Sequence, residues 1–169
     1  MTDTPNATIP ADVGAHDALT FNDDGTITMV EPDGTTTRFG PLALEAYARA
    51  VDVDMEIEAW TLERADEYRS IRERVRAADD DHEKRVLTRQ LNATKRRDDI
   101  EWKRRNATAF VDMMQSSNPR WTPPDVLPQW FGAGGVMRMC LNHWDTVPFR
   151  GLAQARAANA SPNGNDPTT

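Results

Sequence analysis

The sequence predicts a mainly α-helical protein that begins with a small β-meander and ends in a helical segment rich in proline and tryptophan. Three observations support this fold class. Two turn signals, each containing Asp-Gly, divide residues 18–40 into short β-branched runs. Apolar residues then recur every three or four positions through much of 41–118, as they do on one face of a helix. Four prolines between 119 and 128 then interrupt regular structure.

A chain of 169 residues can form one domain with short appendages. We expect a disordered arm over 1–17, a single mostly helical domain over 18–150 and a disordered tail over 151–169. Because only 38% of the residues are apolar, the core should be modest and oligomerisation could add stability. The expected domain has three parts: the β-meander (18–40), helices with a charged hairpin (41–118) and an aromatic segment (119–150).

Three helical runs are expected within 41–118. Pro41 opens the first, because its missing N–H costs nothing at a helix N-terminus. The second covers about 54–77, where a stripe of apolar residues with a period near 3.5 is interrupted by Arg64. The cluster Asp79-Asp80-Asp81 should end this helix and cap a third helix over about 82–117. Two charge-dense helices joined by a short acidic turn suggest a protruding helical hairpin.

The net charge of -7 is unevenly distributed. Residues 1–60 carry -10, residues 61–120 carry +3 and the remainder is neutral. The overall acidity argues against non-specific binding to nucleic acid. The basic stretch 95–105 could contact phosphate, but acidic residues interleave with it. We therefore favour a solvated helix with ion pairs such as Asp99 with Lys103 and Glu101 with Arg105.

No constellation of residues points to catalysis, a metal or a cofactor, so we expect a non-enzymatic protein. Cys140 and His143 could share a face of a short helix over 136–144, but no third group orients them, which favours a buried thiol. The histidines lack zinc-ligand spacing, and the aspartates at 79–81 lack the calcium-loop pattern. The single cysteine fits a reducing cytoplasm, and we see no signal peptide or membrane span.

The aromatic segment contains three of the five tryptophans, more large apolar side chains than so short a stretch can bury by itself. Either it folds back on the helices as core, or part of it forms a partner surface. The second alternative is attractive because aromatic residues and methionine are enriched in interface hot spots. The candidate partner-binding residues are Trp121, Leu127, Trp130, Phe131, Met137, Met139, Trp144, Val147 and Phe149.

Two motifs in this segment carry a family resemblance. Leu-Pro-x-Trp-Phe at 127–131, followed by a short helix and His-Trp-x-Thr-Val-Pro-Phe at 143–149, resembles the C-terminal part of tail assembly chaperones of actinobacterial siphophages. The resemblance implies a protein in the cytoplasm of the infected host that binds the tape-measure protein. It would keep the apolar helices of that protein soluble and be shed as the tail tube assembles.

Further candidate partners are the tail tube protein and a second copy of the chain; neither nucleic acid nor a membrane is expected. One alternative function is a virion structural protein, such as a head–tail connector or minor capsid component, with the aromatic segment as a permanent interface. Another is a regulatory factor that binds nucleic acid through 95–105, with an affinity that falls steeply as salt increases.

Overall fold

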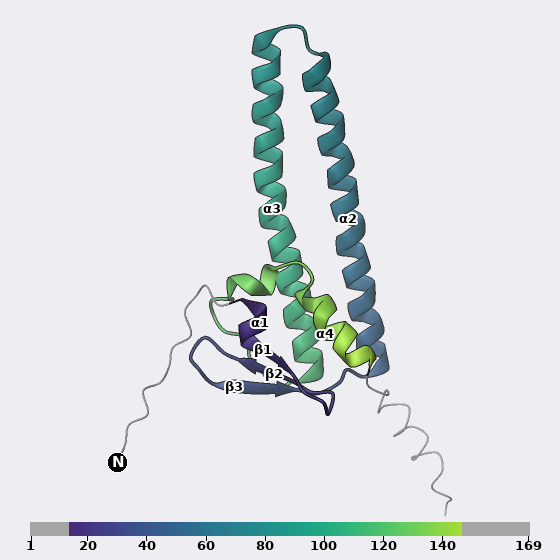
Figure 1. Cartoon of the computed structure of the whole chain (residues 1–169), viewed down its shortest axis with the longest axis vertical. Coiled ribbons are helices and arrows are strands. Elements are labelled where there is room, and N and C mark those ends of the chain that lie inside the picture. The colour runs from purple at the N-terminus through teal and green to yellow at the C-terminus, as the bar shows by residue number, and fades with distance from the viewer. Residues whose placement is uncertain (1–13, 147–169) are drawn as a thin grey trace, which may run out of the picture.

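The computed structural model describes residues 14–146. The expected tail over 151–169 and most of the expected arm lie outside this range, as do Val147 and Phe149. The described chain is mainly helical with a small N-terminal sheet, so the predicted fold class is confirmed (Figure 1). Its elements are α1 (Ala15–Ala18), β1 (Leu19–Phe21), β2 (Ile27–Val30), β3 (Thr36–Phe39), α2 (Leu44–Ala77), α3 (Asp81–Ser117), the 3-10 helix η1 (Gln129–Gly132) and α4 (Val136–Asp145).

The predicted β-meander is a three-stranded antiparallel sheet of order β1-β2-β3. Its two turns use the same side-chain contacts. Asp24 accepts hydrogen bonds from the backbone N–H and hydroxyl of Thr26, and Asp33 accepts the same pair from Thr35. The glycine between each pair has a φ of 81° or 84°, a conformation that glycine adopts without strain. Alternate residues of β2 are buried, so one face of the sheet covers the core.

The short helix α1 corrects the predicted extent of the disordered arm, which was expected to reach residue 17. Ala18 is 2% exposed and Ala15 is also buried, because α1 packs with β1 against the core. A helix of four residues is too short to produce a periodic pattern, and its small alanines gave no apolar signal in the sequence.

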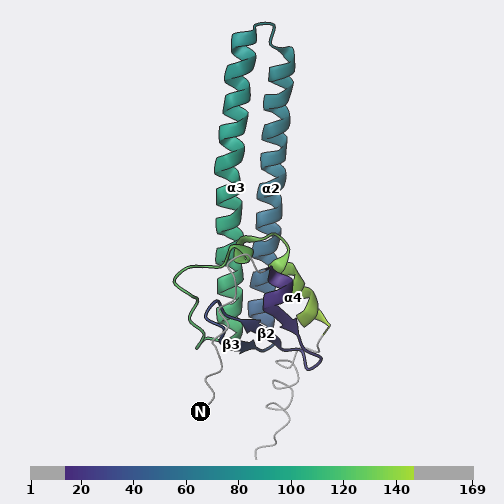
Figure 2. The same cartoon turned by 60° about the vertical axis from the view of Figure 1, so that its left-hand side comes forward.

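Helices α2 and α3 form an antiparallel hairpin that extends beyond the rest of the molecule (Figures 1 and 2). They contain 34 and 37 residues, so each is roughly 50–55 Å long at 1.5 Å per residue. The Asp80 carboxylate accepts a hydrogen bond of 3.0 Å from the backbone N–H of Glu83, which confirms the predicted N-cap of α3.

The continuous helix α2 replaces the two helices predicted for the same region. Pro41 lies before the helix, whose N-cap is Ala43. The predicted break near residue 52 is wrong. Asp52 is exposed and Asp54 is half-buried but paired with Arg138 of α4, so both carboxylates are accommodated within a continuous helix. No glycine or proline interrupts the segment 44–77.

The aromatic segment folds back on the lower part of the hairpin as core, the first of the two alternatives considered for it. Helix η1 packs on α3, and α4 contacts both α2 and α3. One contiguous cluster of buried side chains joins the sheet, the lower hairpin, η1 and α4. Its largest fully buried members are Ile27, Met29, Phe39, Phe110, Met114, Phe131, Cys140 and Trp144.

Candidate functional site

Most of the predicted partner-binding residues lie inside the molecule. Met139 is half-buried, whereas Leu127 is 40% exposed and its neighbour Val126 is 82% exposed. The other described members cannot reach a partner while the base of the molecule keeps this packing. Each of these buried members is at most 9% exposed: Trp121, Trp130, Phe131, Met137 and Trp144.

Phe110 on α3 attaches the aromatic segment to the hairpin. Its ring lies edge-on to Phe131, with centroids 4.8 Å apart, and to Trp130, with centroids 5.4 Å apart. Such aromatic pairs contribute about 0.5–1.5 kcal/mol each beyond the area they bury. The Trp-Phe pair of the Leu-Pro-x-Trp-Phe motif therefore holds η1 in place on α3.

The glycines at 132–135 allow the aromatic segment to pack closely on α3. A Cβ on Gly132 would lie 2.8 Å from the backbone oxygen of Lys103, and one on Gly134 would lie 2.4 Å from the indole of Trp102. Gly135 has a φ of 88° and is the N-cap of α4. Close packing against backbone thus requires a glycine at 132, whereas a side chain at 134 would displace the Trp102 ring. The sequence could not reveal either contact because α3 supplies the neighbouring atoms.

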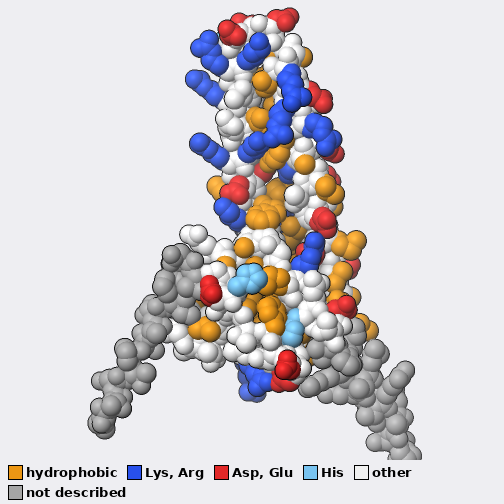
Figure 3. Space-filling model, in the orientation of Figure 1, with side chains coloured by type: hydrophobic (Ala, Val, Ile, Leu, Met, Phe, Trp, Pro, Cys, Tyr) orange, Lys and Arg blue, Asp and Glu red, His pale blue; other side chains and the backbone are white. Residues whose placement is uncertain are grey.

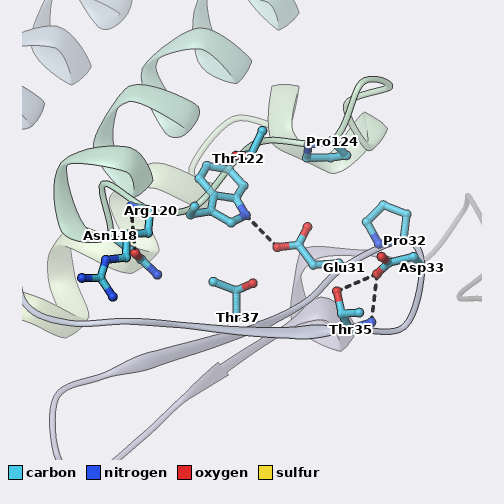
Figure 4. Close-up of a pocket in the computed structure, with 10 residues that line it drawn as sticks. Glu31, Pro32, Asp33, Thr35, Thr37, Asn118, Arg120, Thr122 and Pro124 are labelled. Carbon is cyan, nitrogen blue, oxygen red and sulfur yellow. Dashed lines mark hydrogen bonds between the residues drawn. The ribbon is translucent and has the colours of Figure 1, made fainter.

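A cavity of about 440 Å³ lies beside β3, between the β2–β3 turn and the chain that follows α3 (Figure 4). Glu31, at its side, is only 8% exposed as a residue, and its carboxylate accepts a hydrogen bond of 2.7 Å from Nε1 of Trp121. A buried carboxylate needs such a donor to offset its lost hydration. Glu31 and Trp121 thus form a structural pair between residues 90 positions apart.

Cys140 is a neutral thiol in the core. It is completely buried, and burial raises the pKa of this thiol to about 12. His143, one helical turn away, packs on Phe21 with ring centroids 5.1 Å apart. Because almost no thiolate exists at neutral pH with such a pKa, this pair provides no activated nucleophile. Within residues 14–146, no group of three or more His, Cys, Asp or Glu side chains could hold a metal ion.

The predicted ion pairs of the basic stretch are confirmed. Asp99 binds Lys103 and Glu101 binds Arg105, each at 2.8 Å. Glu101 also accepts two hydrogen bonds of 2.8 Å from Arg104. The hydrogen bonds from Arg104 and Arg105 hold the pKa of Glu101 at about 2. Arg97 also pairs with Asp98 at 3.3 Å, so four of the six basic residues between 95 and 105 are paired with acids of their own helix.

Halfway along the hairpin, polar and aromatic contacts replace a continuous apolar core. The Tyr68 hydroxyl on α2 donates a hydrogen bond of 3.0 Å to Asp98 on α3, which is 6% exposed. The Arg105 guanidinium lies 4.9 Å from the ring centroid of Trp60, and the Lys95 ammonium lies 5.7 Å from that of Tyr68. These contacts explain how two helices with so few buried apolar residues remain paired.

One face of α2 carries a row of apolar residues, which we call the outer stripe. All of its members are exposed except Val51, which is half-buried and packs against the core. At about 100° per residue, its members fall within about 80° of the helix circumference, opposite the buried Ala50, Ile57 and Ile71. Met55 is 62% exposed and Leu62 is 64% exposed. Figure 3 shows hydrophobic side chains along the outer edge of α2. The outer stripe consists of Leu44, Ala48, Val51, Met55, Ala59 and Leu62.

Different charged groups border the two sides of the outer stripe. Glu45, Asp52, Glu56 and Glu63 form an acidic column within about 40° of one another along one side. All four are exposed, and none has an ion-pair or hydrogen-bond partner for its side chain in the described part of the chain. On the other side lies α4, where Arg138 binds both Asp54 and Glu58, at 2.6 and 3.1 Å.

The outer stripe was not predicted from the sequence, because two separate helices were expected in this region. Residues 44, 48 and 51 were assigned to one helix and 55, 59 and 62 to the next, so their common face was not visible. A signal was present, because apolar residues recur at spacings of three and four across the predicted break.

No family model, curated protein or solved structure matches this chain. Among the described residues, no helix combines the length and the apolar character needed to cross a bilayer. The fold defines a mainly helical protein with a long hairpin on a small sheet-and-helix base.

Proposed function

We propose that this chain is a non-enzymatic interaction protein that acts as a phage tail assembly chaperone in the cytoplasm of the infected bacterium. It binds the tape-measure protein and keeps it soluble until the tail tube assembles, when contact with tail tube protein accompanies its release. The outer stripe carries this proposal, because it exposes an apolar row along about five turns of α2.

An exposed apolar row on a rigid helix is suited to binding another helix. Residues at spacings of three, four and seven can interlock with those of a second amphipathic helix, as in helix-in-groove recognition. One face of a single helix buries a limited area, which suits a complex that must later dissociate. The charged upper hairpin, with ion pairs along α3, would keep such a complex dispersed.

The resemblance of the aromatic segment to tail assembly chaperones supports the same function. The large aromatic residues of its motifs that the structure describes, Trp130, Phe131 and Trp144, are buried in the base. They would therefore identify the family through its scaffold, while α2 supplies the binding surface. The base contributes by holding the lower part of α2 against α4 through Arg138.

Co-expression with the tape-measure protein of the same phage tests the proposal. We expect the wild-type chain to move the tape-measure protein into the soluble fraction and Met55→Glu with Leu62→Glu to leave it insoluble. The matched control is Val86→Glu with Ile100→Glu, which changes two exposed apolar residues of α3. If the control and test variants solubilise the partner equally well, the outer stripe is not the binding surface.

Mass spectrometry of purified virions and infected-cell lysate tests the role in assembly. A chaperone should be present in the lysate and absent from virions, because it leaves as the tube forms. A stoichiometric amount in virions would contradict the proposal and favour a permanent structural component, such as a head–tail connector.

A further inference from the structure

We infer that the outer stripe binds an amphipathic helix whose apolar face is bordered by lysine or arginine residues. The inference specifies the partner chemistry of the proposed chaperone site and rests on that function for the identity of the partner. The chemistry itself follows from α2 and its surroundings.

The acidic column determines the charge of the partner. Between residues 44 and 63, six acidic residues accompany the single base Arg49, so this stretch carries a net charge of -5. Asp54 and Glu58 are already bound by Arg138, but the four carboxylates of the acidic column have no partner in the described chain. An apolar surface beside unpaired carboxylates favours a ligand that is apolar on one face and positively charged at its border.

The spacing within the column also fits a helix. Glu45, Asp52, Glu56 and Glu63 are seven, four and seven positions apart, as are Leu44, Val51, Met55 and Leu62 in the outer stripe. Two helices packed along such a repeat bring flanking side chains into reach of one another at the same intervals. Cations repeated every seven or four residues on the partner could thus meet the column while its apolar face covers the outer stripe.

A second copy of the chain fits this surface poorly. An antiparallel two-fold pairing of outer stripes would place the two acidic columns opposite each other, where like charges repel. A parallel pairing would place each column against the α4 side of the other copy, where Arg138 is already bound to two carboxylates. Both arrangements leave the acidic column without a counter-charge, which a basic helix supplies.

The test compares two synthetic three-heptad peptides with identical apolar positions, one flanked by Lys and the other by Glu. Fluorescence anisotropy with the full chain should show binding of the Lys peptide, at least about tenfold tighter than that of the Glu peptide and weakened by salt. Glu56→Lys with Glu63→Lys should reverse this preference. Glu73→Lys with Glu83→Lys, exposed acids near the hairpin tip, should leave it unchanged.

Two results would overturn the inference. Equal affinity for both peptides would show that the partner helix needs no lysine or arginine beside its apolar face. The proposed chaperone function and its co-expression test would be unaffected. Failure of both peptides to bind would show that the outer stripe does not bind a helix of this kind. Light scattering would then test for a dimer. A dimer that Leu62→Glu dissociates would assign the outer stripe to contact with a second copy of the chain. If the wild-type chain binds the Lys peptide but does not solubilise the tape-measure protein, only the proposed function is contradicted.

Discussion

The pair formed by Glu31 and Trp121 links the sheet to the aromatic segment. The indole N–H of Trp121 donates a hydrogen bond to the carboxylate of Glu31, a buried residue. Removing one partner of a buried hydrogen bond leaves the other without hydration, which costs more than the net value of the bond. The pair should therefore respond asymmetrically to single and double substitutions.

Trp121→Phe should lower the free energy of unfolding by about 1–3 kcal/mol, because Glu31 would remain buried without its donor. Urea denaturation followed by circular dichroism measures the change. Trp121→Phe combined with Glu31→Leu should recover much of the loss, since both polar groups are then absent. A double variant that is as unstable as the sum of the two single variants would contradict this account.

Gly132→Ala should destabilise the chain by about 1–3 kcal/mol through overpacking, because the new Cβ would meet the Lys103 carbonyl at 2.8 Å. The new Cβ is attached to the backbone and the oxygen it meets is a backbone atom, so a side-chain rotation cannot relieve this contact. Thermal unfolding compares this variant with Gly40→Ala, where nothing lies within 4 Å of the added Cβ. Equal melting temperatures for the two variants would show that η1 does not need its close approach to α3.

Helix α2 has two faces of different character. Its buried face packs on α3, while the outer stripe and acidic column face away from α3. Helix α3 uses its charged surface differently, because its ion pairs connect residues of the same helix. The stability of α3 should consequently depend on pH, whereas binding by α2 should depend on salt.

Acidification should weaken α3 through Glu101, whose folded pKa of about 2 lies below its ordinary value of 4.5. Such a group stabilises the folded chain fully above about pH 4.5, and the contribution is lost as the pH falls through about 2. Melting temperatures measured across this range should fall more steeply for the wild type than for Glu101→Gln. Glu73→Gln, at an exposed position of α2, is the control and should follow the wild type. Parallel curves for wild type and Glu101→Gln would refute the assignment.

The molecule as a whole separates a packed base from an exposed hairpin. The base buries the aromatic segment, the sheet and the lower ends of both long helices in one cluster. Above it, the hairpin depends on a few buried residues, such as Ile71, Leu87 and Leu91, and on polar contacts such as Tyr68 with Asp98. Substitutions of buried residues in the base should therefore destabilise the fold, and those of the exposed outer-stripe residues Met55 and Leu62 should change only binding.

Trp130→Ala with Trp144→Ala should abolish cooperative folding, because each truncation of a large core aromatic costs about 3–5 kcal/mol. Loss of the thermal transition in circular dichroism is the expected result. Met55→Glu with Leu62→Glu should keep the transition near that of the wild type. A folded double-tryptophan variant that fails to solubilise the tape-measure protein would instead return these tryptophans to the partner surface.

Interactions between residues close together in the sequence could be predicted from the sequence alone. The Asp-Gly turns of the β-meander, the Asp80 cap and the pairing of Glu101 with Arg105 each involve groups within four positions of one another. Their geometry follows from local backbone conformation, which the residue types largely determine. The hairpin followed from the same local information, because an acidic cap separates two long helical runs.

Which surfaces are buried was decided only by the tertiary structure. Trp121 and Glu31 lie 90 positions apart, and the space around Gly132 is occupied by α3. The composition of the aromatic segment is compatible with both a core and an interface. Its packing on Phe110 shows that Trp130 and Phe131 belong to the core. The exposure of the outer stripe likewise depends on where α3 and α4 contact α2. Side-chain burial is a property of residues brought together from distant parts of the chain, so periodicity within one helix cannot specify which face remains exposed.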